Sequence, residues 1–535
     1  MRLPSALSPL RHPAFRLLWL ANLVANTGMW MQNTGAGWLM TSLAPSPIMV
    51  SMVQVASLLP VFLLALPAGA LADIVDRRLY LIGAQAWIAL CGLLLAVLGF
   101  AQLLGPWWLI GLTFAIGTGM AMNSPAWPAT TNETVPREDL TQAIVLNGIG
   151  FNITRAVGPA IGGVVVAAFG AEVTFALNAV CFGVVILALL AWKRPEARAG
   201  LPKEHFVSAV RAGMGFARAS PVLRATVVRG CLFFGFAAAI WGLLPLLVRH
   251  QLGLGPAWFG IMLAAMGVGA VGTGFVLPLL RGRLDRPAMV TGASLLCGVS
   301  LILLGQAAHW SVGVLAMLGF GAAWITGAST LQASAQLAAP AWVRARAIGI
   351  YQMATFGALA LGAALGGWAG EALGLPLTLG LAGLGAAIGG VAAHRLPLEA
   401  APASAAPLAT RPQPSPEPAD PALAGLLAGG RNQVLEVVRY HVDPADRAAF
   451  MRIMVECRGV RLRSGALVWR LCEDVAHPER WVELWMVESW TDHLREQERL
   501  TEADRAVLAR ASGLHRGDGP PEAARYLNVM PDMFR

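Results

Sequence analysis

Long apolar runs with almost no charge recur through the first 395 residues of this chain. A helix that crosses a bilayer needs about 20 largely apolar residues, and about twelve separate runs of this kind can be distinguished. They are centred near residues 26, 60, 90, 119, 155, 181, 235, 269, 298, 324, 357 and 384. One soluble core could not bury so many, so this region predicts an all-α membrane bundle of twelve transmembrane helices.

The composition and the start of the chain agree with a lipid environment. Only 13% of the 535 residues are charged and 56% are hydrophobic, whereas soluble proteins carry about 25% charged residues. The basic start "MRLPSALSPLRHPAFRLLWL" leads directly into a full-length apolar run. It lacks the short apolar region and small-residue cleavage site of a secretory signal, so we expect the first helix to be retained.

The positive charges predict the orientation in the membrane. With the expected helix boundaries, 20 of the 22 Lys and Arg residues in 1–395 lie on one side, and Arg249 lies on the other. Because cytoplasmic loops carry the excess of Lys and Arg, we expect a multi-pass protein of the inner membrane with both termini and the loop 193–221 in the cytoplasm. The formal charge of +9 follows from this topology, and nucleic-acid binding is not expected.

The six cysteines give no sign of a metal site or a disulfide framework. Their spacing does not match a metal-ligand pattern, and Cys91, Cys181, Cys231 and Cys297 fall within apolar runs. A free cysteine in such a place behaves as a small apolar residue. We therefore expect no metal and no cofactor.

The two halves of the apolar region repeat each other. The segment "VPREDLTQAIVLNGIGFNITRAVGPAIGG" (135–163) aligns without gaps to "APAWVRARAIGIYQMATFGALALGAALGG" (339–367), and "DRR" at 76–78 corresponds to "DRP" at 285–287. This predicts two parallel six-helix halves, 1–192 and 222–396. Such halves with a substrate site between them near the midplane are a known transporter plan, which neither a channel nor a membrane-embedded enzyme requires.

Two short motifs carry a family resemblance. The stretch "GALADIVDRR" (69–78) resembles the G-x-x-x-D-x-x-G-R-R loop signature of the major facilitator superfamily, although Asp76 stands where that pattern has glycine. "GPAIGG" (158–163) resembles the G-P-x-x-G-G motif of its drug-exporting antiporters. The segment "NSPAWPATTNETVPREDLTQAIVLNGIGFNITRAVGPAIGG" is similar to the transmembrane secretion effector branch, which includes exporters of siderophores and drugs. The matching residues are Gly69, Asp73, Arg77 and Arg78 in the loop, and Gly158, Pro159, Gly162 and Gly163 in the fifth run.

The resemblance implies a gating role for the loop signature. Asp73 would pair with Arg344 or Arg346 at the start of the eleventh run and hold the outward-facing state until the cytoplasmic side opens. The alternative is a solvated loop charge, and topology alone already explains Arg77 and Arg78. The "GPAIGG" glycines would let a neighbouring backbone approach closely, and Pro159 would permit a bend. Packing alone is the alternative reading of that motif.

Polar residues inside the apolar runs suggest a transport path. Asn22, Asn26 and Asn33 fall on one face of a helix. They either line a path or bind neighbouring helices by hydrogen bonds. The same two readings apply to Gln54, Asn123, Asn132, Asn147, Asn152, Gln332 and Gln336. Four tryptophans offer stacking surfaces or simple packing, namely Trp30, Trp127, Trp241 and Trp324.

Arg155 is the most unusual residue of the membrane region. It lies ~15 residues into a run that starts near Leu140, or roughly 20 Å along a helix, so its side chain cannot reach the surface. A midplane arginine costs at least about 2.5–3.5 kcal/mol and should point inward to a partner or to water. It is either a substrate contact or one member of a buried charge pair. Drug antiporters usually carry a buried arginine in the fourth run, which has none here, so Arg155 takes that role or the role is absent.

The energy source is expected to be an ion gradient. No G-x-x-x-x-G-K nucleotide-binding motif is present. Carboxylates near the apolar runs sit toward their ends, and Glu133, beyond the "PAWPA" break, is the candidate proton site. The resulting hypothesis is a secondary transporter that exports a small, fairly apolar molecule, drug or siderophore from the cytoplasm by alternating access.

The remaining sequence predicts a separate cytoplasmic domain. Residues 397–430 form a Pro/Ala-rich linker, and residues 431–535 show a βαββαβ order that is ferredoxin-like, with one helix over 490–512. The domain resembles the dimeric α+β barrel of small antibiotic-biosynthesis monooxygenases. The strand at 480–489 is apolar on both faces, so a homodimer contact is expected there.

Catalysis by this domain is not expected. His441, Trp469, Trp490 and His493 could line a pocket, but they form no metal-ligand spacing and no nucleophile–base arrangement. Dimerisation or ligand sensing fits better. A membrane-tethered enzyme or ligand sensor, with the tail as the active part, is the rival hypothesis for the whole chain. Duplicated halves argue against it, because an anchor does not need them.

Overall fold

The computed structural model of the chain describes residues 5–136, 138–192, 214–339, 343–399, 420, 432–500 and 502–528. It divides into two compact units. The helical unit comprises Met1–Leu201, Ala225–Ser334 and Tyr351–Leu398, and the second unit comprises Pro202–Arg224, Ala335–Ile350 and Glu399–Arg535. The ends 1–192 and 222–396 expected for the two membrane halves remain predictions, as do the linker 397–430 and the tail 431–535. Most of that linker lies outside the described residues.

The first half of the helical unit contains six long helices, which follow the short η1 (Ser5–Arg11). They are α1 (Pro13–Leu43), α2 (Pro47–Ile74), α3 (Arg77–Phe100), α4 (Pro106–Thr134), α5 (Leu140–Phe169) and α6 (Ala171–Ala191). Proline opens α1, α2 and α4, because its fixed φ suits the first helical turn and its missing N–H is not needed there.

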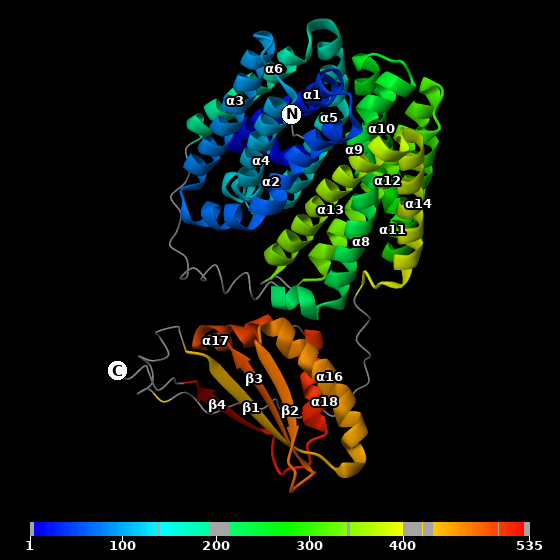
Figure 1. Cartoon of the computed structure of the whole chain (residues 1–535). Helices are drawn as coiled ribbons and strands as arrows, with labels where there is room; N and C mark the ends of the chain where they lie inside the picture. Colours follow the sequence, from blue (N-terminus) through cyan, green and yellow to red (C-terminus); the bar gives the residue numbers. More distant parts are fainter. Residues whose placement is uncertain are drawn as a thin grey trace. The chain divides into compact units, whose positions relative to one another are not determined.

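The second half repeats this order in space. It contains α8 (Pro221–Ala237), α9 (Ala239–Leu246), the π-helix η2 (Leu247–Gln251), α10 (Pro256–Arg281), α11 (Arg286–Gly305), α12 (Trp310–Leu337), α13 (Arg344–Leu373), α14 (Leu375–Ala392) and η3 (Ala393–Arg395). The first half is drawn blue to cyan and the second green to yellow in Figure 1, where the two lie side by side.

Two pairs of equivalent residues show that the repeat is structural. Asp76 accepts a hydrogen bond from the Leu79 backbone N–H at 3.1 Å and caps α3, and Asp285 accepts one from Ala288 at 2.8 Å and caps α11. Gly170 between α5 and α6 has a φ of +91°, and Gly374 between α13 and α14 has a φ of +81°. Both corners need the left-handed backbone that glycine adopts without strain.

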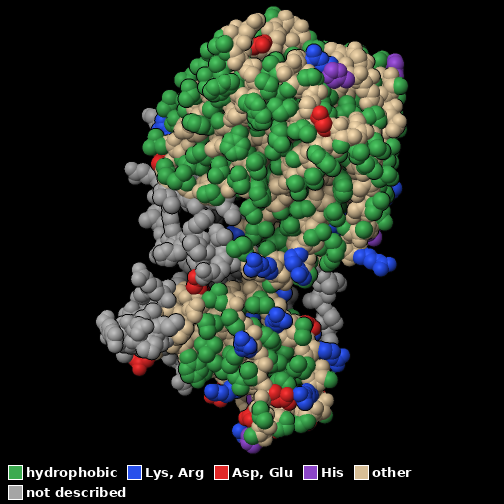
Figure 2. All heavy atoms as spheres, in the orientation of Figure 1, with side chains coloured by type: hydrophobic (Ala, Val, Ile, Leu, Met, Phe, Trp, Pro, Cys, Tyr) green, Lys and Arg blue, Asp and Glu red, His purple; other side chains and the backbone are tan. Residues whose placement is uncertain are grey.

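Ten helices of the described region are long and apolar enough to cross a membrane. The helices α1 and α4 are also long, with 31 and 29 residues, but they do not reach that level of apolarity. The number of twelve expected from the sequence is therefore not confirmed. The visible face of the helical unit is covered largely by hydrophobic side chains, with few charges (Figure 2), as contact with lipid requires.

The halves meet through a crossing of α5 and α10 at which no side chain separates the backbones. A Cβ atom on Gly163 would lie 2.8 Å from the Cα of Gly260 and 2.9 Å from the carbonyl oxygen of Pro256. In the reverse direction, a Cβ on Gly260 would lie 2.6 Å from the carbonyl oxygen of Pro159. Gly158 and Gly162 make similar approaches to Trp30 and Met31 of α1. The "GPAIGG" residues thus seat α5 between α1 and the second half.

One end of this interface is also joined by hydrogen bonds. Arg249, in η2, donates to the hydroxyls of Thr41 (2.8 Å) and Ser42 (2.5 Å) at the end of α1. Ser46, just before α2, donates to a carboxylate oxygen of Glu371 in α13 at 2.5 Å. At this end the two halves are in direct polar contact.

The tail forms an antiparallel sheet covered by helices. Its elements are β1 (Val434–His441), η5 (Pro444–Asp446), α16 (Arg447–Ser464), β2 (Val468–Glu473), β3 (Arg480–Val487), α17 (Trp490–Arg499), α18 (Glu502–Gly513) and β4 (Glu522–Leu527). The strand order is β2-β3-β1-β4, so a small antiparallel sheet exists with the βαββαβ order expected of a ferredoxin-like domain. The single helix expected over 490–512 is wrong. The backbone is extended at Leu500, whose side chain packs against the tail core. This residue ends α17, so α18 is a separate helix.

The two faces of β3 differ in burial. Trp481, Trp485 and Val487 belong to the tail core, with Phe450 and Met454 of α16. The opposite face of β3, with Val482, Leu484 and Met486, is half-buried. Within the described residues, one apolar face is thus packed on helices, and the other retains exposed apolar surface.

We expect Gly163→Ala to lower the free energy of unfolding by about 1–3 kcal/mol, because the added methyl group meets backbone atoms of α10 that cannot rotate away. Thermal unfolding in detergent measures this. Gly148→Ala is the matched control on the same helix, since a Cβ at Gly148 meets nothing within 4 Å. Equal stability of the two variants would contradict the tight α5–α10 crossing.

Candidate functional site

A cavity of about 500 Å³ lies between the two halves of the helical unit. The first half contributes residues of α1, α2, α4 and α5 to its lining, and the second half contributes residues of α9, α10, α12 and α13. Its size falls within the range of sites for drug-sized ligands. Both halves form its wall, so a change in their relative position would change the cavity.

Of the described residues that line this cavity, Arg155 is the only charged one. It is 7% exposed. Its Nη2 lies 4.0 Å from the Sδ of Met266, and its Cζ lies 5.1 Å from the centre of the Trp324 ring. Both contacts come from the second half, so the side chain crosses from α5 to α10 and α12. No described residue accepts a hydrogen bond from its Nε, and no carboxylate pairs with it in the described region.

Arg229 is another deeply buried arginine among the described residues of the helical unit. Its hydrogen bonds are those expected of an arginine with a purely structural role. It is 2% exposed, and its Nη2 donates to the carbonyl oxygen of Pro287 at 2.7 Å and the hydroxyl of Thr291 at 3.0 Å. Its Nη1 donates to the carbonyl oxygens of His394 and Leu396. Four oxygens thus accept from the Arg229 guanidinium, whereas the partners of the Arg155 guanidinium in the described region are a sulfur and a ring.

Aromatic rings extend from Arg155 across both halves. Trp324 and Trp241 of the second half have ring centres 5.7 Å apart, and Trp241 and Trp30 of the first half have ring centres 6.2 Å apart. All three tryptophans line the cavity. A planar cargo would therefore meet a row of rings that begins beside the guanidinium.

Four of the amide side chains expected on the path line the cavity: Asn26, Asn33, Gln54 and Asn123. The other six expected amides are not among its described lining residues: Asn22, Asn132, Asn147, Asn152, Gln332 and Gln336. Asn147 donates to the hydroxyl of Thr131 at 3.1 Å, and Asn152 donates to the carbonyl oxygen of Gly148 on its own helix. Asn147 thus contacts a neighbouring helix, which was the second reading of the polar pattern, whereas Asn152 bonds within α5 itself.

Sequence reasoning missed several apolar members of the lining. Phe151, Phe259 and Phe356 contribute to it, and Met266 contacts Arg155. Gln32 also lines the cavity, and Asn178 of α6 donates to its side-chain oxygen. A phenylalanine or methionine in an apolar run carries no signal that separates a cavity wall from a lipid contact.

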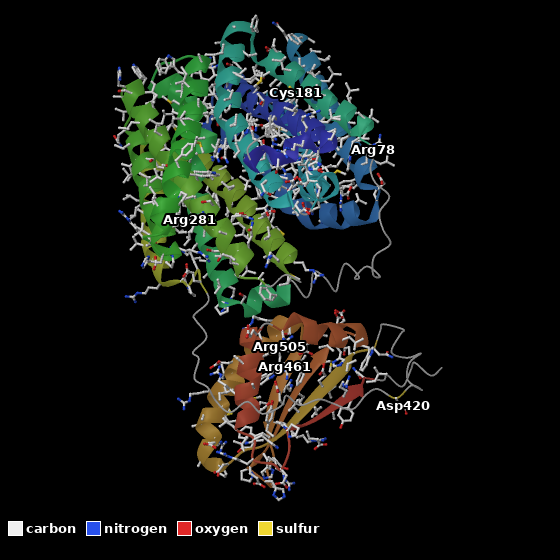
Figure 3. All side chains as sticks on the ribbon, turned by 180° about the vertical axis from the view of Figure 1, so that it is seen from behind. Arg78, Cys181, Arg281, Asp420, Arg461 and Arg505 are labelled. Atoms are coloured by element: carbon white, nitrogen blue, oxygen red, sulfur yellow. The ribbon has the colours of Figure 1, made fainter. Side chains whose placement is uncertain are left out.

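Two arginines of the loop signature have partners within the first half. Arg77 is ion-paired with Glu133 of α4. Arg78, labelled in Figure 3, donates to the carbonyl oxygens of Leu189 and Leu190 at 2.7 and 2.6 Å and caps the end of α6. The Asp73 side chain lies outside the described residues, so its pairing with Arg344 or Arg346 remains a prediction. Gly69 has open space around it.

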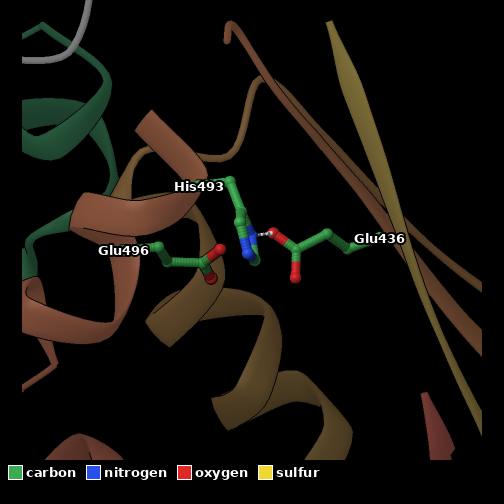
Figure 4. A group of neighbouring side chains, drawn as sticks. All are labelled: Glu436, His493 and Glu496. Atoms are coloured by element: carbon green, nitrogen blue, oxygen red, sulfur yellow. Dashed lines mark hydrogen bonds and ion pairs between the residues drawn. The ribbon is translucent and has the colours of Figure 1, made fainter. Parts of the chain in front are cut away.

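The tail contains one buried group of side chains with metal-ligand chemistry, Glu436, His493 and Glu496, shown in Figure 4. One ligand atom from each lies within 4.8 Å of the others. His493 Nδ1 is 2.5 Å from Glu436 Oε1, and its Nε2 is 2.9 Å from Nη1 of Arg525. The Glu496 oxygens accept from Arg461 at 3.2 Å and from the Trp485 indole at 3.1 Å.

These partners favour an internal ion-pair network over a metal centre. Arg461, labelled in Figure 3, also donates to Glu483 at 3.3 Å and stacks on Trp485 at 3.6 Å from the ring centre. Two guanidinium groups would repel a cation at this place. Of the four residues considered for a pocket, His441, Trp469, Trp490 and His493, the structure brings the rings of Trp490 and His493 together, with their centres 4.9 Å apart. His493 is buried in the network, Trp469 donates to Glu483 at 2.9 Å, and His441 is exposed at the end of β1.

The network should make tail stability depend on pH. Burial raises the pKa of Glu496, against the opposing effect of Arg461, and the neighbouring Glu436 raises it further. The folded tail therefore holds a proton that the unfolded chain releases near pH 4.5. We expect the free energy of unfolding to fall as pH rises from about 5 to 8, by up to about 1.4 kcal/mol per unit.

Urea unfolding of fragment 431–535, followed by tryptophan fluorescence, measures this pH dependence. Glu496→Gln is the matched variant, because its amide keeps the shape and cannot ionise. A pH slope of the same size in both proteins would rule out Glu496 as the titrating group.

Comparison with known proteins agrees with this geometry. The family model described as transmembrane secretion effector matches residues 4–532. The chain is 26% identical over 375 residues to the enterobactin exporter EntS of Escherichia coli O45:K1, a match that covers 68% of this chain and 86% of that protein. It is 23% identical over 293 residues to the macrolide efflux protein A of Streptococcus pyogenes, covering 54% of this chain and 72% of that protein.

A solved structure shares the fold. A POT family transporter, crystallised in complex with 5-aminolevulinic acid, superposes with a TM-score of 0.60 at 13% identity and covers 71% of this chain and 94% of that one. With the repeated halves and the cavity between them, these findings show that the chain belongs to the transmembrane secretion effector family of the major facilitator superfamily and is a membrane transporter rather than an enzyme.

Proposed function

We propose that this transporter exports a small, fairly apolar molecule, drug or siderophore from the cytoplasm by alternating access, with Arg155 as a cargo contact. The observation that carries the proposal is a buried arginine that has no ionic partner among the described residues and lines a cavity that both repeated halves enclose. A buried charge is costly and persists where it has a function. The two relatives named above are exporters by their names, which supports the direction.

The membrane arrangement that we propose has twelve crossing helices, with α1 and α4 added to the ten apolar ones. Both lie against other long helices of the first half and line the cavity, so their lower apolarity fits helices that face the interior. In this arrangement both termini lie in the cytoplasm and the protein lies in the inner membrane, which the distribution of positive charges supports. In this arrangement the pairing of Asp73 with Arg344 or Arg346 acts as the latch. Cysteine labelling of the α3–α4 and inter-half loops from each side tests this topology.

We expect Arg155→Ala to lose transport while its free energy of unfolding changes by less than about 1 kcal/mol, because no described side chain loses an ionic partner. Arg155→Lys should recover part of the activity, since lysine keeps the charge without the planar donor fork. Uptake into inside-out vesicles, screened with siderophores and dyes, and thermal unfolding measure the two effects on the same preparations.

Arg229→Ala is the matched comparison for this experiment. It should lose about 1–3 kcal/mol of stability, because buried carbonyl groups lose their donor, and transport should fall with it. A similar loss of stability in Arg155→Ala, or a larger one of about 3–5 kcal/mol as for a broken buried ion pair, would show that Arg155 has a structural role only.

We propose an ion gradient as the driving force, with Glu133 as the proton site. Its carboxylate is about one-fifth exposed and is ion-paired with Arg77, so a proton that neutralises it would release Arg77 at the start of α3. In Glu133→Gln, we expect an imposed pH gradient to stop driving transport, while exchange of cargo down its own gradient persists. Undiminished pH-driven uptake by this variant would eliminate Glu133 as the coupling residue.

For the tail, we propose a homodimer through the half-buried face of β3. The exposed part of Val482, Leu484 and Met486 would be covered by the same face of a second copy. Light scattering of the detergent-solubilised chain, compared with a chain that ends after Arg395, tests this. Equal masses per polypeptide would argue against it.

A further inference from the structure

We propose that the cavity selects a cargo that carries a negatively charged group beside an aromatic ring, such as an arene carboxylate, and discriminates against organic cations. The inference rests on the proposed function, because it concerns the same cavity. The inference goes beyond the proposed function by assigning the sign of the cargo's charge and the position of its ring.

The charge of the cavity supports an anion. Among the lining residues that the structure describes, Arg155 is the single ionisable side chain, and none is Asp, Glu, Lys or His. Arg155 as a residue is only 7% exposed, so its charge is largely removed from bulk water. An anionic cargo would supply the counter-charge that the described residues do not provide. A cationic cargo would add a second positive charge with no carboxylate to receive it.

The donors of Arg155 are available for a bidentate acceptor. Its Nε has no hydrogen-bond partner in the described region, and the one acceptor near Nη2 is the thioether of Met266 at 4.0 Å, which is a weak acceptor. A carboxylate takes two parallel N–H donors from an arginine. No described oxygen accepts from this fork. The Nε of Arg229 also lacks a partner, but both Nη atoms of Arg229 donate to oxygens.

The rings beside the guanidinium support an aromatic cargo. The Arg155 Cζ lies 5.1 Å from the Trp324 ring centre, and Trp241 and Trp30 continue the row at spacings of 5.7 and 6.2 Å. A flat cargo bound by its acidic group at Arg155 would have its ring next to Trp324 or Trp241. The amides of Asn26 and Asn33 offer hydrogen bonds to any hydroxyl groups on that ring.

Three naphthalene probes of matched shape test the charge preference on the full-length chain in a neutral detergent. They are 2-naphthoate, 2-naphthylmethanol and 2-naphthylmethylammonium, and quenching of tryptophan fluorescence or calorimetry gives their dissociation constants. We expect the anion to bind at least about tenfold more tightly than the alcohol, and the ammonium to bind least. In Arg155→Gln the anion should lose at least about tenfold in affinity, while the alcohol changes less than about twofold.

Two further variants keep the test decisive. Arg155→Lys should retain the preference for the anion at lower affinity, which covers the case that Arg155→Gln does not fold. Arg281→Gln removes an exposed arginine of α10 outside the cavity lining and should leave the order unchanged. Equal affinity for the three probes, tighter binding of the ammonium, or an anion preference that survives in Arg155→Gln would each overturn the inference.

Transport separates this inference from the proposed function. If the probes bind in the expected order but inside-out vesicles accumulate no cargo of any charge, export is wrong and the anion site stands. If the vesicles accumulate cationic dyes as well as aromatic anions, and Arg155→Gln leaves this ratio unchanged, export stands and the anion site is overturned.

Discussion

The backbone-to-backbone crossing of α5 and α10 is the constraint on which the central cavity depends. With glycine at 163 and 260, the two helices approach until Cα atoms and carbonyl oxygens fill the space of a side chain. Only at this separation can Arg155, two turns before Gly163 on α5, reach Met266 and Trp324 of the other half. A bulkier residue at the crossing would move the guanidinium away from the tryptophan row. The glycines at the crossing thus determine where the guanidinium lies relative to the tryptophan rings.

Three buried arginines of this chain show three ways of placing a guanidinium in a protein interior. Arg461 in the tail is matched by Glu483 and Glu496 and lies flat on Trp485. Arg229 is surrounded by carbonyl and hydroxyl oxygens at the end of α14. In the described region, Arg155 has neither solution and keeps a sulfur contact and a cation–π contact. The Nε of Arg229 also lacks a hydrogen-bond partner, but its two Nη atoms donate to oxygens, whereas no described oxygen accepts from Arg155. A partner from outside the chain is therefore expected for Arg155.

Much of the architecture could be read from the sequence, because it follows from periodic and repeated patterns. The alignment of 135–163 with 339–367 predicted parallel halves, and the structure extends it to the matching glycine corners at 170 and 374. The tail order βαββαβ was also readable. The break at Leu500 was not, because the residues on both sides favour a helix.

The members of the site were harder to predict. Asn26 and Asn33 could not be told from Asn152 by pattern, since the sequence does not distinguish an amide that points into a cavity from one that bonds its own helix. The Glu436–His493–Glu496 network joins strand and helix across 57 residues, which no local spacing shows.

At the end where hydrogen bonds join the two halves, the attraction between the halves acts only over a short distance. Arg249 is bound there to hydroxyl groups and not to carboxylates. The attraction between a charge and a dipole falls off more steeply with distance than that between two charges, and a hydrogen bond is lost once its atoms separate by more than about 3.5 Å. This end therefore behaves as a short-range catch. The attraction between the halves is strong while this end is closed and almost absent after a small separation. It depends little on the salt concentration of the medium.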